Sequence, residues 1–92
     1  MRRRGKIIRS RWEIILDISR AISEEGGMVK KTHIMQKAYL DWRNFQKHFT
    51  FLLEQGFVGE REDPEGEGKV YYLTEEGKNL LKSLREVEQV LR

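Results

Sequence analysis

The sequence contains no cysteine, which excludes disulfides, thiolate nucleophiles and cysteine-based zinc sites. No uninterrupted apolar run approaches the roughly 20 residues that a membrane-spanning helix needs. The Arg-rich start resembles the first part of a signal peptide, but Glu13 and Asp17 interrupt the apolar stretch that would have to follow it. We therefore expect a cytoplasmic protein that does not enter a membrane.

Catalytic and cofactor-binding patterns are also missing. No Ser/His/Asp arrangement has a suitable context, and the run Gly66-Glu67-Gly68 is too short for a dinucleotide-binding loop. The two histidines, His33 and His48, are not spaced as a metal-binding pair on one helix face, and no cysteine accompanies them. The sequence therefore predicts no enzymatic activity, no cofactor and no metal site.

The charged residues that are present divide unevenly along the chain. The 92 residues hold 18 Lys and Arg against 15 Asp and Glu, a net charge of +3. Residues 1–50 hold 12 basic and 5 acidic residues, a net charge of +7, whereas residues 51–92 hold 6 and 10, a net charge of −4. The length predicts a single domain, and its basic half favours a polyanionic partner.

The first part of the chain shows two helical patterns. Ser10 can cap a first helix, whose apolar residues recur at three- and four-residue spacing until Gly26 and Gly27 end it. Thr32 is a good cap for a short second helix over residues 33–38. Trp12 is expected to pack rather than to bind a ligand. The other side chains expected in the core are those of Ile14, Ile15, Ile18, Ala21, Ile22, Ile34, Met35 and Ala38.

A third helix is expected after a short break at Tyr39-Leu40. Asp41 can cap this helix, and Gly56 can end it in the left-handed conformation. On a helical wheel of about 100° per residue, the side opposite the apolar stripe carries Arg43, Asn44, Lys47, Phe51 and Glu54. We expect the last helix or a partner subunit to cover Phe51. The predicted stripe itself consists of Trp42, Phe45, Phe49, Leu52 and Leu53.

The pattern changes after the third helix. Residues 57–61 and 69–73 read as two short strands that flank a turn-rich tip, and together they form a β-hairpin. Thr74 can then cap a final helix with a coiled-coil seam. We expect this helix to form a homodimer or to pack back on the first helix. The dimer contacts would come from Leu80, Leu84, Val87 and Leu91.

The order helix, helix, helix, hairpin, helix predicts an α+β fold that is mostly α, a winged helix-turn-helix. The sequence also resembles the archaeal winged-helix regulators, which include small, dimeric, chromatin-associated DNA-binding proteins. The resemblance is carried by the runs KTHIM (residues 31–35), FQK (45–47), LLEQGFV (52–58) and YLTEEGK (72–78). It implies DNA binding. Two departures are Asp41, where the family usually has Ser, and a final helix shorter than that of the chromatin-associated members.

Three segments follow from this organisation: a basic N-terminal arm over residues 1–9, a winged-helix domain over 10–73 and a C-terminal amphipathic helix over 74–92. Arg43 and Asn44 lie in the first turn of the third helix, where base edges in the major groove are met, and Lys47 is expected to meet phosphate. The start of the second helix offers free N–H groups to an anion. The residues expected to contact DNA are Arg2, Arg3, Arg4, Lys6, Lys31, Thr32, His33, Arg43, Asn44, Lys47, Arg61 and Lys69.

These observations favour sequence-specific binding of double-stranded DNA in transcriptional regulation. Two alternatives remain open: a winged helix that serves as a protein–protein interaction module, and a chromatin protein that binds DNA without sequence preference. The hairpin is expected to stay away from the duplex, or to touch it only through Arg61 and Lys69 at its base, because residues 60–69 hold five acidic residues and two basic ones, a net charge of −3.

Overall fold

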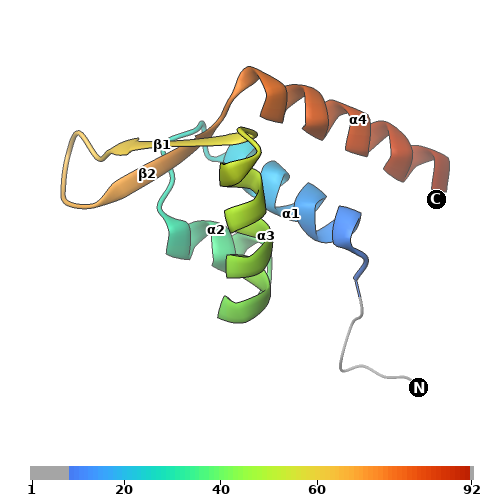
Figure 1. The fold of residues 1–92 in the computed structure, drawn as a ribbon, viewed down its shortest axis with the longest axis horizontal. Coiled ribbons are helices and arrows are strands. Elements are labelled where there is room, and N and C mark those ends of the chain that lie inside the picture. The colour runs from blue at the N-terminus through green and yellow to red at the C-terminus, as the bar shows by residue number, and fades with distance from the viewer. Residues whose placement is uncertain (1–8, 92) are drawn as a thin grey trace.

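Four helices and one antiparallel hairpin form the structure, a computed structural model that describes residues 9–91 (Figure 1). Their order confirms the predicted mostly helical α+β winged helix-turn-helix fold. None of the helices within these residues is long and apolar enough to cross a membrane. The elements are α1 (Arg11–Glu24), α2 (Lys31–Lys37), α3 (Trp42–Glu54), β1 (Val58–Glu62), β2 (Lys69–Leu73) and α4 (Glu75–Leu91).

Three of the predicted helix boundaries are confirmed by their hydrogen bonds. The backbone N–H of Ser10 donates to the Glu13 carboxylate at 2.9 Å, as in a capping box, and this bond lowers the pKa of Glu13. The Asp41 carboxylate accepts from the N–H of Asn44 at 2.8 Å at the start of α3. The Thr74 hydroxyl accepts from the backbone of α4 at 3.1 Å. Gly56 follows α3 with φ 80°, the expected left-handed end.

The predicted cap of α2 is wrong. Lys30, not Thr32, is the N-cap residue, and Thr32 lies exposed within the first turn of the helix. The cause is tertiary: the backbone of Val29 pairs with that of Tyr71 in β2, with hydrogen bonds of 3.3 and 2.9 Å. The extended segment ends at this bridge, so the helix begins at once after Lys30.

The hairpin projects from one side of the helices and forms the wing (Figure 1). Its strands pair in register from Val58 opposite Leu73 to Glu62 opposite Lys69. The N–H of Asp63 donates to the Gly68 carbonyl at 3.0 Å and closes the tip. The first strand begins and ends one residue later than predicted.

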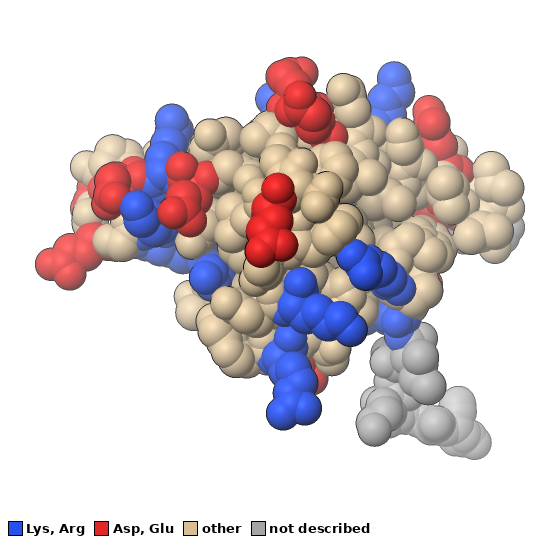
Figure 2. Space-filling view, viewed as in Figure 1, with Lys and Arg blue, Asp and Glu red and all other residues tan. Residues whose placement is uncertain are grey.

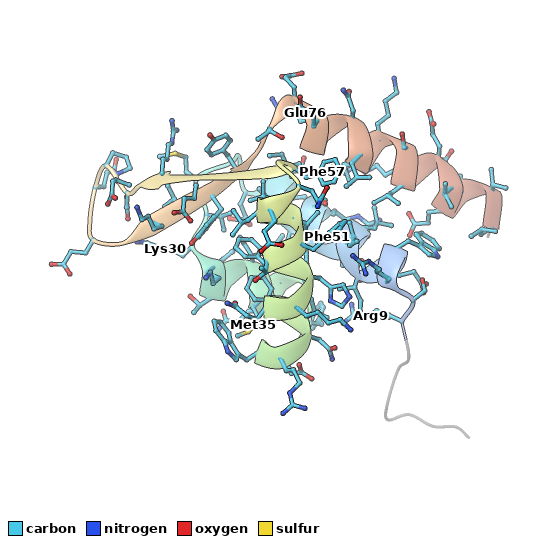
Figure 3. The ribbon with its side chains drawn as sticks, in the orientation of Figure 1. Arg9, Lys30, Met35, Phe51, Phe57 and Glu76 are labelled. Atoms are coloured by element: carbon cyan, nitrogen blue, oxygen red, sulfur yellow. The ribbon has the colours of Figure 1, made fainter. Side chains whose placement is uncertain are left out.

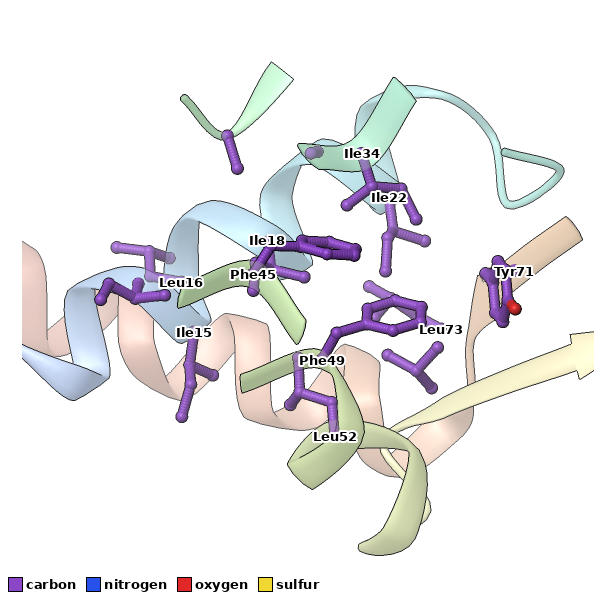
Figure 4. Close-up of a cluster of buried hydrophobic side chains, with 14 of the residues drawn as sticks. Ile15, Leu16, Ile18, Ile22, Ile34, Phe45, Phe49, Leu52, Tyr71 and Leu73 are labelled. Atoms are coloured by element: carbon purple, nitrogen blue, oxygen red, sulfur yellow. The ribbon is translucent and has the colours of Figure 1, made fainter. Parts of the chain in front are cut away.

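The core lies where α1, α3 and the base of the wing meet (Figure 4). Phe45 and Phe49 stack with ring centroids 4.8 Å apart, and the edge of Tyr71 meets Phe49 at 4.9 Å. Burial is the main cause of the raised pKa of Tyr71. The predicted stripe of α1 is confirmed, and Trp12 packs against the core as expected. The buried residues of α1 are Ile14, Ile15, Leu16, Ile18, Ser19, Ala21 and Ile22.

The predicted stripe of α3 is wrong at its first residue. The side chain of Trp42 is 53% exposed, because α3 begins there and the ring extends beyond the buried Phe45, 6.2 Å away. Leu53 is half-buried rather than buried. The buried set gains His48, whose Nδ1–H donates to the Asn44 carbonyl at 2.8 Å.

The last helix packs against α1, which is the alternative that the sequence left open (Figure 1). Leu81 is its buried anchor, and Leu80 and Leu84 are half-buried against the core. An ion pair of 3.1 Å between Arg20 of α1 and Glu88 ties the two helices together. The C-terminal part of the predicted seam is not buried within the chain. Val87 and Leu91 are 42% and 65% exposed, and their neighbour Val90 is 81% exposed.

Candidate nucleic-acid interface

The outward face of α3 carries basic and amide side chains, as the helical wheel predicts. Arg43, Asn44 and Lys47 are all exposed. Within residues 9–91 neither Arg43 nor Lys47 forms an ion pair, so both positive charges are free to meet a polyanion. Figure 2 shows a group of blue side chains over the lower half of α3, whereas over the wing red side chains are mixed with blue ones.

The amide of Asn44 is partly engaged by the cap of its own helix. Its Nδ2 donates to Asp41 Oδ2 at 3.3 Å, while the other carboxylate oxygen accepts the backbone N–H of the same residue. The side-chain amide of Asn44 therefore keeps its oxygen, Oδ1, and one of the two Nδ2 hydrogens for a further hydrogen bond. Asp41 places a carboxylate at the tip of α3, where it can accept a hydrogen bond but repels a phosphate.

Lys31 lies beside this face and is held among aromatic rings. Its ammonium group stands 5.5 Å from the ring centroid of Phe49, 5.8 Å from that of Tyr71 and 6.0 Å from that of Trp42. The half-buried lysine therefore sits between the start of α2 and the first turn of α3. Its predicted contact with DNA stays a prediction.

Arg11 extends the basic face along α3, a role that the sequence analysis did not assign to it. Its guanidinium lies 4.4 Å from the ring centroid of Phe51. Phe57 also lies beside the half-buried ring, with the two ring centroids 6.4 Å apart (Figure 3). The cover that we expected from the last helix or a partner thus comes, in these contacts, from Arg11 and Phe57. The sequence signal was the apolar side chain of Phe51 on the polar side of the helix, which indicates that other side chains cover it.

Arg9 fastens the start of α1 to the turn between α2 and α3. Its Nη1 donates to Asp17 at 2.6 Å and to the Ala38 carbonyl at 3.0 Å, and its Nη2 donates to the Tyr39 carbonyl at 2.8 Å. Tyr39 has φ 56°, an uncommon conformation for a residue with a side chain, and this clamp helps to hold it. The sequence did not indicate this residue's role, because its partners come from two distant segments.

His33, predicted to contact DNA at the start of α2, is directed to the end of α1 instead. Nε2 of His33 lies 3.4 Å from a Glu25 carboxylate oxygen at the end of α1. Lys37 on the same helix also reaches Glu25, at 3.5 Å. Thr32 is exposed without capping the helix. The structure therefore brings Lys31, but not His33, next to the face of α3.

The two basic residues of the wing, Lys69 and Arg61, both have partners near the hairpin. Lys69 binds Glu62 at 2.6 Å, which raises the lysine pKa. Arg61 donates to the sulfur of Met28 at 2.8 Å and lies 5.6 Å from the ring centroid of Tyr72. Neither is grouped with the residues of α3.

Lys30 latches the wing tip to the start of α2 (Figure 3). Its ammonium group lies 2.9 Å from Asp63 Oδ2 and donates to the Glu67 carbonyl at 2.5 Å. The N–H of Glu65 and then the Lys30 charge lower the pKa of Asp63. The acidic tip is therefore fixed in place beside α2.

The four basic residues predicted for the N-terminal arm, Arg2, Arg3, Arg4 and Lys6, lie outside the described residues. Within the described part of the chain no group of three or more His, Asp or Glu side chains could hold a metal ion. The candidate interface consequently consists of the outward face of α3 with the flanking Lys31 and Arg11.

Comparison with known proteins agrees with this architecture. The winged helix-turn-helix family model matches residues 8–92. An uncharacterized protein from Methanocaldococcus jannaschii is 40% identical over 83 residues, which cover 90% of this chain and 77% of the relative. The chain belongs to the winged helix-turn-helix family. This membership confirms the resemblance to archaeal winged-helix proteins that its motifs carry.

Solved structures share the winged-helix fold of this family member. Sso10a-2, a DNA-binding protein from Sulfolobus solfataricus, has a TM-score of 0.76 and 24% identity, over 89% of this chain and 81% of that chain. The transcriptional regulator SlyA has a TM-score of 0.67 and 26% identity, over 83% of this chain and 53% of that chain. The winged-helix chain thus spans about half of the SlyA structure.

Proposed function

We propose that this protein binds double-stranded DNA and regulates transcription, with the N-terminal half of α3 in the major groove. The observation that carries the proposal is the free basic face of α3, where Arg43 and Lys47 are exposed and have no ion pair within residues 9–91. The names of two structural neighbours, a DNA-binding protein and a transcriptional regulator, support it.

The first turn of α3 carries the sequence recognition in this proposal. The major groove admits an α-helix, and Arg pairs with guanine and Asn with adenine through its base edges. Arg43 is free for such a pairing, and Asn44 retains one amide N–H and its carbonyl oxygen. Lys47 lies one turn further along, where it meets phosphate and adds affinity without sequence preference.

The second contribution comes from the basic residues on both sides of α3. Lys31 flanks its first turn, and Arg11 flanks its later turns from the start of α1. Arg2, Arg3, Arg4 and Lys6 precede Arg9 in the chain, and we assign them phosphate or adjacent minor-groove contacts. These charges supply most of the non-specific affinity.

The wing does not contribute in this proposal. Lys69 is paired with Glu62 and Lys30 with Asp63, so the wing neutralises these two basic side chains. Among the described residues, Arg61 is engaged by the Met28 sulfur and the Tyr72 ring rather than by an acid. Uncompensated carboxylates at the tip, including Glu65, repel a phosphate within about 8 Å at physiological ionic strength. Binding rather than catalysis is proposed, because no catalytic constellation is found in the sequence.

A selection from random duplexes tests sequence-specific binding. We expect the protein to enrich one motif, and Arg43→Ala to weaken its binding by about 1–3 kcal/mol and to relax the preference at one base pair. Arg85→Ala is the matched control, an exposed arginine on α4 that should leave binding unchanged. Binding without an enriched motif would favour the chromatin alternative. No binding to any duplex would favour the protein–protein interaction module.

We also propose that the protein forms a homodimer through the end of α4. Val87, Val90 and Leu91 are exposed there, and a second copy of the same surface would bury them. Val90→Glu should leave the fold intact and convert a dimer to a monomer of about half the mass in light scattering at micromolar concentration. A monomer in both proteins would contradict this proposal, and Asn79→Glu on the same helix is the control.

A further inference from the structure

Trp42 is an exposed apolar side chain at the start of α3, at the edge of the candidate interface. It is 53% exposed at the first residue of α3, next to Arg43. Tryptophan can bury about 150–250 Å², so roughly half of a large apolar surface faces water here. A soluble protein gains nothing from this exposure by itself, and a ligand surface that covers the ring would gain stability.

The ring is held in place rather than free. On one side it meets Phe45 of the core, with centroids 6.2 Å apart and the rings inclined by 36°. The ammonium group of Lys31 stands 6.0 Å from its centroid. Met35 lies beside this end of α3 (Figure 3). The ring therefore presents a fixed apolar surface that is bordered by positive charge.

The positive border decides what can cover this ring. The Lys31 ammonium lies beside the ring and Arg43 is the next residue of the helix, so an apolar protein surface that covers the ring would have to desolvate positive charge, at a high cost. A DNA duplex instead supplies phosphates to the cations. Its major groove offers one apolar feature, the C5-methyl group of thymine.

We propose that Trp42 determines specificity for thymine, by covering the C5-methyl group of one thymine in the major groove. This inference rests on the proposed function and adds to it the base that is read beside Arg43. The two residues are consecutive in the first turn of α3 and differ by about 100° around its axis, so they meet different bases. A guanine contact and a thymine contact then form neighbouring parts of one recognition site.

The test replaces each thymine of the selected site by deoxyuridine, which removes only the methyl group. The contribution of a buried CH₂ or CH₃ group is about 0.8 kcal/mol, which corresponds to about fourfold in affinity. At one position we expect uracil to weaken binding by the unsubstituted protein about fourfold. With Trp42→Ala the same replacement should have no effect, although this variant binds the thymine site more weakly.

Two further proteins separate this role from a structural one. Trp42→Leu keeps an apolar side chain and should retain part of the uracil penalty. Asn79→Ala shortens an exposed side chain on α4, outside both proposed surfaces, and should retain the full penalty. In Trp12→Phe, Trp42 is the only tryptophan, and its fluorescence should shift to shorter wavelength when the thymine site binds and less when the uracil site binds.

The outcomes distinguish this inference from the proposed function. A uracil penalty of equal size in the unsubstituted protein and in Trp42→Ala, or no penalty at any thymine, would overturn the role of Trp42 while DNA binding stands. Enrichment of a site without thymine, or binding without sequence preference, would overturn it in the same way. Failure to bind any duplex would overturn both proposals.

Discussion

The Arg9 clamp gives a quantitative prediction about the turn between α2 and α3. Arg9→Met keeps most of the apolar stem and removes three hydrogen bonds, to Asp17, the Ala38 carbonyl and the Tyr39 carbonyl. The side chains of the Arg9–Asp17 pair are only 23% and 27% exposed, so this is not a weak surface ion pair. The turn between the two helices should lose its main side-chain support.

The expected loss follows from the energies of such bonds. A hydrogen bond to a charged group contributes about 1.5–3 kcal/mol, and water can replace part of it once the guanidinium is gone. We expect Arg9→Met to lower the free energy of unfolding by about 2 kcal/mol, measured by urea denaturation. For a domain of this size the melting temperature should fall by about 8–16 °C.

A comparison variant isolates the contribution of the clamp. Lys78 pairs with Glu75 at 3.7 Å between two exposed side chains, so Lys78→Met should change stability little. If Arg9→Met behaves like Lys78→Met, the clamp does not hold the turn and the reasoning is refuted. An equal loss in Asp17→Asn and Arg9→Met, without further loss in the double variant, would show that the two side chains act as one unit.

Three further predictions concern the wing and the helix starts. Gly77→Ala should lower the melting temperature, because the added Cβ would overlap the backbone carbonyl of Phe57. This overlap should outweigh the helix preference of alanine, about 1 kcal/mol, and a higher melting temperature would contradict the close contact between Gly77 and Phe57. Replacing the tip between Asp63 and Gly68 by a tight turn should leave DNA affinity unchanged or slightly higher, and a loss would mean that the wing binds DNA. The pKa values of Asp63 and Glu13 are lowered in the folded state, so both carboxylates stabilise the fold at pH values above their ordinary pKa values of 3.8 and 4.5, and this stabilisation is lost as the pH falls through the lowered values. In urea denaturation the stability of Glu13→Gln should therefore depend less on pH in this range, and an unchanged pH dependence would contradict the role of Glu13.

Most of the fold was predictable because local signals and the tertiary structure agree. Asp41 and Thr74 cap the helices that they were predicted to cap, and Gly56 adopts the expected positive φ. These signals act within a few residues of the chain and need no knowledge of distant partners. The apolar spacing of α1 was also sufficient, since this helix is covered along most of its length.

The errors arose where a distant segment decides the outcome. The bridge between Val29 and Tyr71 fixes where α2 begins, and no local pattern near Thr32 shows it. Trp42 has the spacing of a core residue, but it is the first residue of α3 and lies beyond the side chains that cover the rest of the stripe. The site prediction follows the same rule: the face of α3 was predictable from periodicity, whereas the pairing of His33 with Glu25 depends on how α1 meets α2.

The central claim is that the basic half of the chain binds duplex DNA through phosphate contacts around α3. The most direct measurement is the affinity for a duplex at a series of salt concentrations, with Lys47→Ala measured in parallel. If about five phosphates are neutralised, the slope of log affinity against log salt should be roughly −4 to −5, and Lys47→Ala should reduce its magnitude by about 1. Tight binding with a flat salt response, or no binding at low salt, would contradict the account.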